Sequence, residues 1–429
     1  MATDQQHLPS STDAPADASP NASRISGGEC PIDHTALSQK KTAHPAERLE
    51  GPRVERDAAG RWHIRGYSEA RSVLRNTNTT QAGFRAELIQ RVSGAGNVPI
   101  LYQEGKVHQQ QRKQTARFFT PKAVSSDYRQ IMERLADELV ATLKREKRAD
   151  LSALTLSLAV RVAAEVIGLT NSRLPGMQRR LDAFFTDGAA RRSRGIGALI
   201  RSLLPQSNMA AFFFLDVQPA IQARKRQPRE DVISHLLAQG YRDREILTEC
   251  VTYGAAGMVT TREFISVATW HFLERPELRA RYLAASEIER QEMLQEILRL
   301  EPVVGHLYRR ATADIPVEAG DGHTITIPQG DLIDLHIYAA NVDEYVVGEQ
   351  PLAVCPARPL RDERATPAML GFGDGHHRCP GSYIALQETD IFLQRLLALD
   401  GLRVVHPPHL AWNDLVTGYE LRDFPIALD

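Results

Sequence analysis

Phe372-Gly-Asp-Gly-His-His-Arg-Cys-Pro-Gly381 is the most informative segment of the chain. It places Cys379 between glycines, and the apolar periodicity of residues 384–397 predicts a helix that begins just after this cysteine. Glycines let the backbone take positive φ and approach a flat partner closely. The N-terminus of a helix favours a thiolate, and His377 adds a cationic or hydrogen-bonding group beside it. The alternative is an inert buried cysteine on a glycine-rich turn.

The overall composition is that of an ordinary globular protein and excludes two classes of function. The chain has 429 residues, of which 24% are charged and 42% hydrophobic, and its formal net charge is −1. This neutral balance gives no support for a nucleic-acid partner, which needs a concentrated basic surface. The longest apolar stretch, residues 209–215, is far shorter than the roughly 20 residues of a membrane-spanning helix, so we expect no membrane span. Four scattered cysteines suit a reducing, cytoplasmic location.

The pattern along the chain predicts one large domain after a leader. Residues 1–45 are rich in Ser, Ala, Pro and Asp, and we expect a disordered or loosely ordered leader there, because such a segment buries little apolar surface. Residues 46–429 carry no linker, and we expect a single catalytic domain that is mainly α with small β-sheets. Strand patterns occur at 52–64, 316–337 and 401–405. Helical periodicity covers residues 67–75, 107–119, 125–147, 151–167, 175–185, 217–226, 230–238 and 242–273.

The cysteine segment resembles a known signature. Phe-Gly-x-Gly-x-His-x-Cys-x-Gly over residues 372–381 matches the haem-ligand motif of the cytochrome P450 superfamily at every specified position. The resemblance, which extends over about residues 50–429, implies a single-domain cytochrome P450 fold with haem b between the long central helix and the cysteine-loop helix. It implies that Cys379 is the thiolate ligand of the iron, the only metal ligand, and that His377 contacts a haem propionate. It further implies that Phe372 packs over the sulfur side of the porphyrin and that Gly381 belongs to the haem-binding loop.

Two further motifs resemble those of the family. Glu296-Ile-Leu-Arg299 has the spacing of its Glu-x-x-Arg pair, which lies on one helix face, and Arg358 would complete the structural cluster that holds the cysteine loop. His108-Gln-Gln-Gln-Arg112 resembles the His-x-x-x-Arg of bacterial members, whose side chains reach a propionate. The alternative for each pair is a solvated helix face. Arg309 is the remaining propionate candidate, with Arg310 beside it as an alternative.

The long helical segment carries glycines that an ordinary core helix disfavours. Gly254-Ala-Ala-Gly257 would cost about 1 kcal/mol per glycine relative to alanine, which suggests close approach of a flat group or a local opening of the helix. The family pattern here is Ala/Gly-Gly-x-Asp/Glu-Thr-Thr/Ser, in which the acid and the threonine help deliver protons to dioxygen. The resemblance therefore assigns catalytic roles to Gly257, Thr260 and Thr261.

Val259 stands where the family has its acid, and valine neither relays a proton nor holds a water molecule. Three interpretations follow from this departure. Thr260 and ordered waters suffice, or another group such as Glu263 or the substrate itself replaces the acid, or the enzyme uses peroxide or performs an atypical oxidation. We favour the first two.

The resemblance also implies partners. A monooxygenase of this type takes electrons from a ferredoxin and its ferredoxin reductase, and an acidic ferredoxin suits the basic run Lys106, Arg112, Lys113, Arg117 and Lys122. A solvated helix face explains this run equally well. The small organic substrate would contact residues 79–100, 184–214, 255–260 and 303–307. The arginines 191, 192, 194 and 201 favour an anionic or carrier-bound substrate or, equally, a solvated lid.

The sequence therefore predicts a haem-thiolate monooxygenase that hydroxylates a small organic substrate with dioxygen and two electrons from a ferredoxin. The same fold would also serve a peroxide-driven or oxidative-coupling enzyme, which the valine at position 259 favours. A non-catalytic haem-binding sensor is a remote alternative, because a sensor has no need of the Gly-Thr helix.

Overall fold

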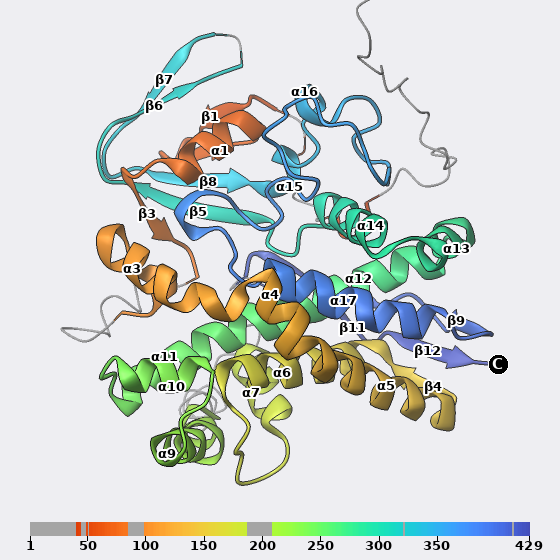
Figure 1. Ribbon diagram of the computed structural model, residues 1–429. Helices are drawn as coiled ribbons and strands as arrows, with labels where there is room; N and C mark the ends of the chain where they lie inside the picture. Colours follow the sequence, from red (N-terminus) through yellow and green to blue (C-terminus); the bar gives the residue numbers. More distant parts are fainter. Residues whose placement is uncertain are drawn as a thin grey trace, which may run out of the picture. The chain divides into compact units, whose positions relative to one another are not determined.

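Helices make up most of the regular structure, as predicted. The strands between residues 54 and 82 and between residues 306 and 336 lie on one side of the helices, and the strands of residues 402–428 lie apart from them, near the C-terminus (Figure 1). The computed structural model describes residues 40–43, 49, 51–84, 98–186, 208–320, 322–413 and 416–429. Contacts within the chain place all of these residues in one unit, Ile32–Asp429.

Most of the longer helices follow the predicted segments closely, but no helix was predicted for residues 276–284, and of residues 287–300 only the Glu296–Arg299 pair was placed on a helix. The longer helices are α1 (Tyr67–Arg75), α3 (Gly105–Thr115), α5 (Arg129–Glu146), α6 (Leu151–Ile167), α7 (Met177–Thr186), α9 (Gln218–Arg226), α10 (Val232–Ala238), α11 (Asp243–Gly254), α12 (Thr260–Leu273), α13 (Pro276–Ala284), α14 (Glu287–Leu300) and α17 (Ser382–Leu397). Short helices are α4 (Pro121–Ala123), α15 (Ile337–Ala340) and α16 (Glu344–Val347).

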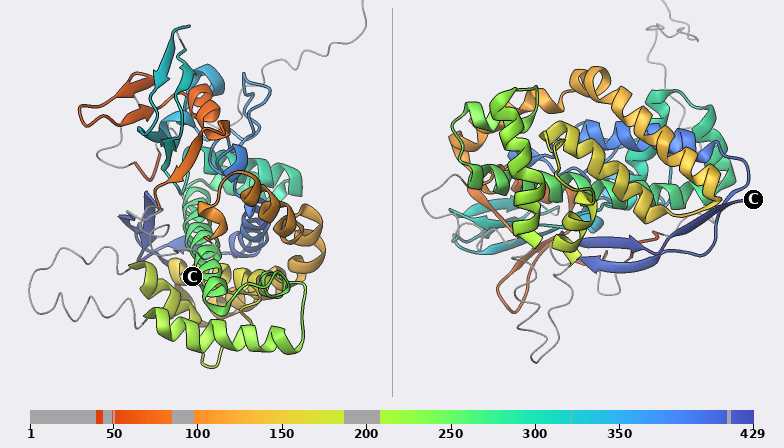
Figure 2. Two further views of the ribbon diagram at one scale, coloured as in Figure 1. Left: turned by 90° about the vertical axis from the view of Figure 1, so that its left-hand side faces the viewer. Right: turned by 90° about the horizontal axis from the view of Figure 1, so that it is seen from below.

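Local sequence signals fix several helix ends. Helix α14 begins with a capping box in which Ser286 and Glu289 satisfy each other's backbone amides. Helix α6 begins at a cap in which the Asp150 side chain accepts from the amide of Ser152, and it ends at Gly168 with φ of 100°. These caps hold α6 beside α12, the central helix, which also packs against α17 (Figure 2).

The strands form four sheets, of which the largest has the order β1-β2-β8-β5-β3. The predicted strand regions at 52–64, 316–337 and 401–405 are confirmed as β1 and β2, β6 to β8, and β9. Strands β3, β4, β5 and the C-terminal strands β10 to β12 were not predicted. The strands are β1 (Val54–Arg56), β2 (Trp62–Ile64), β3 (Thr79–Ala82), β4 (Arg148–Asp150), β5 (His306–Ala311), β6 (Ile315–Glu318), β7 (Thr324–Ile327), β8 (Leu332–His336), β9 (Leu402–Val404), β10 (His409–Asn413), β11 (Gly418–Arg422) and β12 (Pro425–Leu428).

Among the described residues, two apolar clusters form much of the core. The larger cluster lies among α5, α6, α11, α12 and α17, and the smaller one packs the large sheet against α1. In the sheet, Ile64 of β2 and Ile333 and Leu335 of β8 belong to this second cluster. Successive side chains of a strand alternate between faces, so the residues between them, His63 and Asp334, which are register partners, lie on the other face.

The predicted leader, residues 1–45, lies mostly outside the described residues, and its boundary stays a prediction. Within it, residues 40–43 contact the helical domain. The Thr42 hydroxyl donates to Glu301 Oε2 at 2.6 Å, and Thr42 is fully buried. Among the described residues, no helix combines the length and apolar character that crossing a membrane requires.

Candidate active site

The cysteine loop, residues 372–381, ends where helix α17 begins, and its backbone requires glycine. Gly373 and Gly375 have φ of 66° and 67°, a conformation that strains other residues. A Cβ atom at Gly375 would lie 2.2 Å from the Leu74 carbonyl oxygen. The Cys379 amide donates to the Phe372 carbonyl at 2.9 Å. These constraints hold the cysteine at one position against α1.

The side chain of Cys379 is both deep and accessible. Cys379 is exposed, yet burial raises the pKa of its thiol. The Gly381 amide and the Arg112 guanidinium lower this pKa, but by less than burial raises it. The helix N-terminus therefore does not make the free thiol acidic, contrary to expectation, because desolvation is the larger effect. The Cys379 sulfur thus lies inside the fold but remains accessible, and it can bond a group that is bound there.

Polar side chains from four elements meet beside this loop. A cavity of about 40 Å³ is lined by His108, His377, Glu104 and Arg309, among others. The His108 and His377 rings stack with centroids 4.2 Å apart, and burial lowers the pKa of His108 to about 4. His377 Nε2 lies 3.1 Å from Glu104 Oε2. No sequence pattern pointed to Glu104, which immediately precedes helix α3.

Arg309 is a buried cation whose described hydrogen bonds go to neutral groups. It is 2% exposed, and its guanidinium donates to the Gln81 side chain and to the Tyr308 carbonyl. Burial lowers its pKa to about 10, because a charge removed from water is destabilised, and the nearby Glu104 carboxylate raises this pKa by less than burial lowers it. Its position in the cavity lining therefore fits an anionic group. Arg310 instead donates to the Gly330 carbonyl, so Arg309 is the better of the two candidates.

Arg112 lies one helical turn from His108, as predicted, but points to the cysteine loop. Its guanidinium donates to the Arg378 carbonyl and lies close enough to Cys379 to lower the pKa of the thiol. The structure thus brings His108, His377 and Arg309 to one cavity and sets Arg112 beside it.

The long helical segment opens at its glycines, as one of the sequence interpretations predicted. Between α11 and α12, residues Ala255–Val259 form a π-helical turn, a feature that often marks functional sites. The Thr260 hydroxyl donates to the Ala256 carbonyl. Ala256 is exposed and Thr260 half-buried, so this face borders open space. Phe372 of the cysteine loop is half-buried.

The neighbouring side chains point elsewhere. Thr261 is 6% exposed and Val259 is 4% exposed, and Val259 belongs to the large apolar cluster. A Cβ atom at Gly257 would contact Ala163 of helix α6 at 3.7 Å, so this glycine faces another helix. Among the predicted catalytic residues, Thr260 is the one whose hydroxyl lies on the accessible face.

The Glu263 carboxylate is buried and bonds to groups of helix α12 and strand β11. Its carboxylate accepts from the Leu421 amide and from the Arg422 guanidinium, each at 2.7 Å, and it is fully buried. The Arg262 guanidinium lies 2.8 Å from it as well. These contacts tie α12 to strand β11 and leave the Glu263 carboxylate buried and occupied by its own partners, so it does not replace the missing acid.

Comparison with known proteins places this geometry in a family. The family model for cytochrome P450 matches residues 290–399. The chain is 26% identical over 343 residues to the biotin biosynthesis cytochrome P450 of Bacillus subtilis (strain 168), covering 78% of this chain and 82% of that protein. It is 27% identical over 424 residues to the cytochrome P450 monooxygenase PikC of Streptomyces venezuelae, covering 92% and 94%.

Solved structures agree on the fold. P450BioI in complex with an acyl carrier protein ligated to hexadec-9Z-enoic acid superposes with a TM-score of 0.70 at 24% identity, covering 88% of this chain and 94% of that one. CalO2 gives a TM-score of 0.71 at 22% identity, covering 88% and 93%. The chain belongs to the cytochrome P450 family. It is a cytochrome P450 monooxygenase, and membership of the family implies a haem cofactor.

Two independent observations show that the residues of this site fit a haem. The donor set offers a deep, accessible sulfur at Cys379. The cavity beside it holds a buried cation, Arg309, without a carboxylate among its described hydrogen-bond partners. Haem presents an iron that takes a thiolate and propionates that take cations, so both features of the site match the group.

A buried cluster of Glu296, Arg299 and Arg358 holds the segment that leads into the cysteine loop. The Arg299 guanidinium lies 2.7 and 2.8 Å from the Glu296 carboxylate and is fully buried. Arg358 Nε donates to the same carboxylate at 3.1 Å, and the Cys355 amide does so at 2.9 Å. Arg299 also donates to the carbonyls of Asn341 and Pro351. The predicted Glu-Arg-Arg cluster is therefore formed, and its partners are backbone carbonyls of the segment that leads into the cysteine loop.

Proposed function

We propose that this cytochrome P450 is a haem-thiolate monooxygenase that hydroxylates a small organic substrate with dioxygen and two electrons from a ferredoxin. The observation that carries the proposal is the Cys379 sulfur, deep in the fold yet accessible, near the end of a loop that Gly373, Gly375 and the start of α17 hold in place. When bound, the haem supplies the activation of dioxygen.

In this proposal Cys379 is the thiolate ligand of the iron. The Gly381 amide, which lowers the pKa of the thiol, stabilises the negative charge on sulfur. Phe372 would pack against the sulfur side of the porphyrin. Cys379 would hold the iron as a thiolate, because a thiol that coordinates a metal is deprotonated.

His108, His377 and Arg309 would hold the haem propionates, with Arg112 at the edge of the same site. Two observations support this assignment: His108, His377 and Arg309 line one cavity, and the described hydrogen-bond partners of Arg309 include no anion. A propionate entering this cavity would compensate the buried guanidinium. It would also approach the Glu104 carboxylate, which His377 contacts, so His377 has to serve both groups.

Thr260 is the proposed proton-delivery residue. Its hydroxyl donates to the Ala256 carbonyl within the π turn, and rotation about χ1 lets it hold a water molecule on the accessible face instead. Val259 and Glu263 point into the core or toward β11, so the acid's role falls to water or to a polar group of the substrate. Gly257 and Thr261 act through the shape of the helix.

The electron donor we propose is a ferredoxin with its ferredoxin reductase. Helix α3 and the turn after it expose Lys106, Lys113, Arg117 and Lys122, together with Val107, which is 65% exposed. An apolar residue among exposed cations suits docking of an acidic protein. Lys113→Glu should raise the KM for ferredoxin while product formation with peroxide stays unchanged. Lys144→Glu, an exposed lysine on α5, is the matched control.

The substrate contacts that we predicted lie partly outside the described residues. Residues 85–97 and 187–207, with the arginines 191, 192, 194 and 201, are in this group. Within the described part, Ala256 is exposed and Val304 of the segment 303–307 is half-buried, whereas His306 bonds Asp334 on the polar face of the large sheet. The structure of a relative with an acyl carrier protein-linked fatty acid supports the proposal of a carrier-bound substrate here.

The domain limits, 1–45 for the leader and 46–429 for the catalytic domain, and a cytoplasmic location belong to this proposal. Its test is a comparison of product yields with ferredoxin, ferredoxin reductase and NAD(P)H against peroxide alone. Turnover that needs the redox partners supports the proposal, whereas turnover with peroxide alone replaces it by the peroxide-driven alternative that Val259 favours. Thr260→Ala should uncouple electron consumption from product, and Thr260→Ser should restore coupling.

A further inference from the structure

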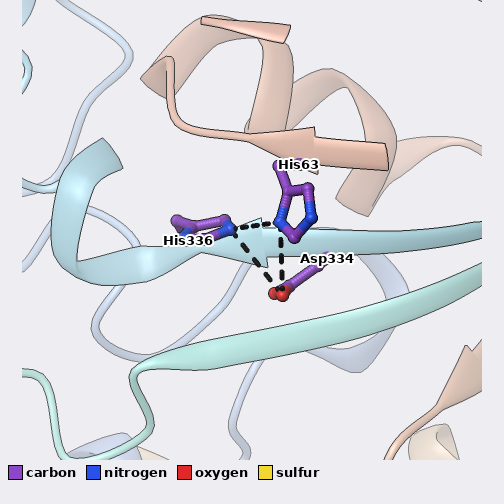
Figure 3. A group of neighbouring side chains, drawn as sticks. All are labelled: His63, Asp334 and His336. Atoms are coloured by element: carbon purple, nitrogen blue, oxygen red, sulfur yellow. Dashed lines mark hydrogen bonds and ion pairs between the residues drawn. The ribbon is translucent and has the colours of Figure 1, made fainter. Parts of the chain in front are cut away.

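Three side chains on the polar face of the large sheet converge on one point, away from the cysteine loop. Figure 3 shows His63 of β2 and Asp334 and His336 of β8 turned toward one another. Their register explains the meeting. His63 pairs with Asp334 across the parallel strands β2 and β8, and Asp334 and His336 are two residues apart on β8, so all three share one face.

The geometry of these atoms points to a metal site. We propose that His63 Nδ1, Asp334 Oδ2 and His336 Nε2 bind a Zn²⁺ ion, with a water molecule as the fourth ligand. Tetrahedral zinc with bonds of about 2.0–2.1 Å holds its ligand atoms about 3.3 Å apart. The two imidazole nitrogens are 2.8 Å apart, and each is 3.7 Å from Asp334 Oδ2. Shifts of about 0.5 Å bring all three to the required spacing.

Neighbouring groups fix the orientation of the ligands as zinc sites require. His63 Nε2 lies 3.0 Å from Asp57 Oδ2, so a proton held there leaves Nδ1 with its lone pair toward the metal. A zinc-bound histidine almost always donates its other ring N–H in this way. The second oxygen of Asp334 lies 2.8 Å from His306 Nδ1, which supports the carboxylate from the side opposite to the metal.

Burial and charge also favour a cation. The side chains of Asp334 and His336 are 4% and 11% exposed, and that of His63 is 17% exposed, which leaves an entry path from solvent. The described polar partners of the Asp334 carboxylate are imidazoles. A divalent ion compensates this buried carboxylate and replaces the proton shared by the two imidazole nitrogens. Two nitrogens and one oxygen form a donor set that zinc accepts readily.

The test uses the full-length, haem-loaded protein, stripped of metals with a chelator and dialysed against ZnCl2, with bound zinc measured by elemental analysis. The wild type should bind one equivalent of zinc more than His63→Ala or His336→Ala does. His409→Ala removes an exposed histidine of β10 and should bind as much zinc as the wild type. Zinc at 100 times its Kd should raise the wild-type Tm by about 3 °C and leave that of His63→Ala unchanged.

A second variant keeps the test decisive if a ligand variant fails to fold, which its Soret band would reveal. Asp57→Asn keeps all three ligands and removes the orienting carboxylate, so its zinc affinity should fall about 10- to 100-fold. Equal zinc binding and affinity in the wild type, His63→Ala and Asp57→Asn would overturn the proposal. The cluster would then be a hydrogen-bonded network without a metal.

Discussion

Val259→Asp restores the acid of the family pattern at its sequence position, and the structure predicts that it damages the protein without helping catalysis. Val259 is 4% exposed and packs in the large apolar cluster. A carboxyl group placed there is desolvated, and burial raises the pKa of such a group by about 3–5 units. Because the side chain faces the core, the new group cannot reach water on the Thr260 face.

The size of the effect follows from the pKa shift. An unfolded aspartate has a pKa of about 3.9, so a folded pKa near 7 or above leaves the new group largely protonated at pH 7. This pKa shift lowers the free energy of unfolding by about 4 kcal/mol at pH 7 and by about 1.5 kcal/mol at pH 5, in addition to the pH-independent cost of a neutral polar side chain in the core. Because the carboxyl pKa is raised on folding, the pH-dependent part of the loss is present above the unfolded pKa and disappears as the pH falls toward 4.

The assay is thermal unfolding by circular dichroism at pH 7 and pH 5. For 429 residues the entropy of unfolding is about 0.9 kcal/mol/K, so the Tm of Val259→Asp should lie below that of Val259→Asn by about 4–5 °C at pH 7 and by about 2 °C at pH 5. Val259→Asn has the same shape without the charge and should lower the Tm equally at both pH values. Product yield per electron pair should not rise. An unchanged Tm together with better coupling would refute this reasoning, because it would mean that position 259 reaches the proton path.

Three other changes test the frame of the site. Glu296→Ala leaves the Arg299 guanidinium buried without its carboxylate, so the free energy of unfolding should fall by about 3–5 kcal/mol and the Tm by about 3–6 °C. The control Arg403→Ala breaks an exposed ion pair and should cost under about 1 kcal/mol. A similar loss of Tm in both variants would contradict the account. Burial raises the pKa of Glu388 to about 8, so this carboxyl destabilises the folded state above its unfolded pKa, increasingly up to about pH 8. Glu388→Gln should therefore raise the Tm at pH 8 and make the Tm less dependent on pH. An unchanged Tm at pH 8 would show that the Glu388 carboxyl does not destabilise the fold. The Lys113→Glu variant should lose its rate defect in high salt, because screening removes the repulsion of an acidic ferredoxin.

The fold and the cysteine loop could be predicted because their signals are local. Ten consecutive residues carry the glycines, the histidine and the cysteine, and a helical pattern directly follows them. The same holds for Glu296 and Arg299, which lie three residues apart on one helix. Such short-range patterns survive without knowledge of tertiary contacts.

Other features depend on packing that the sequence does not display. His63 and His336 meet only because β2 pairs with β8 in parallel, across more than half of the chain. The direction of Val259 follows from the π turn, which shifts the helical register by a residue and defeats a periodicity of 3.6. Glu104 enters the cavity from the end of a loop, and no pattern in its own neighbourhood marks it.

The most direct test of the account is the spectrum of the reduced protein with carbon monoxide. If the Cys379 sulfur bonds the haem iron, the wild type should give the strongly red-shifted Soret band of thiolate-ligated ferrous haem, and Cys379→Ala should lose that band. The same red-shifted band in Cys379→Ala, or its absence from the haem-loaded wild type, would contradict the central claim.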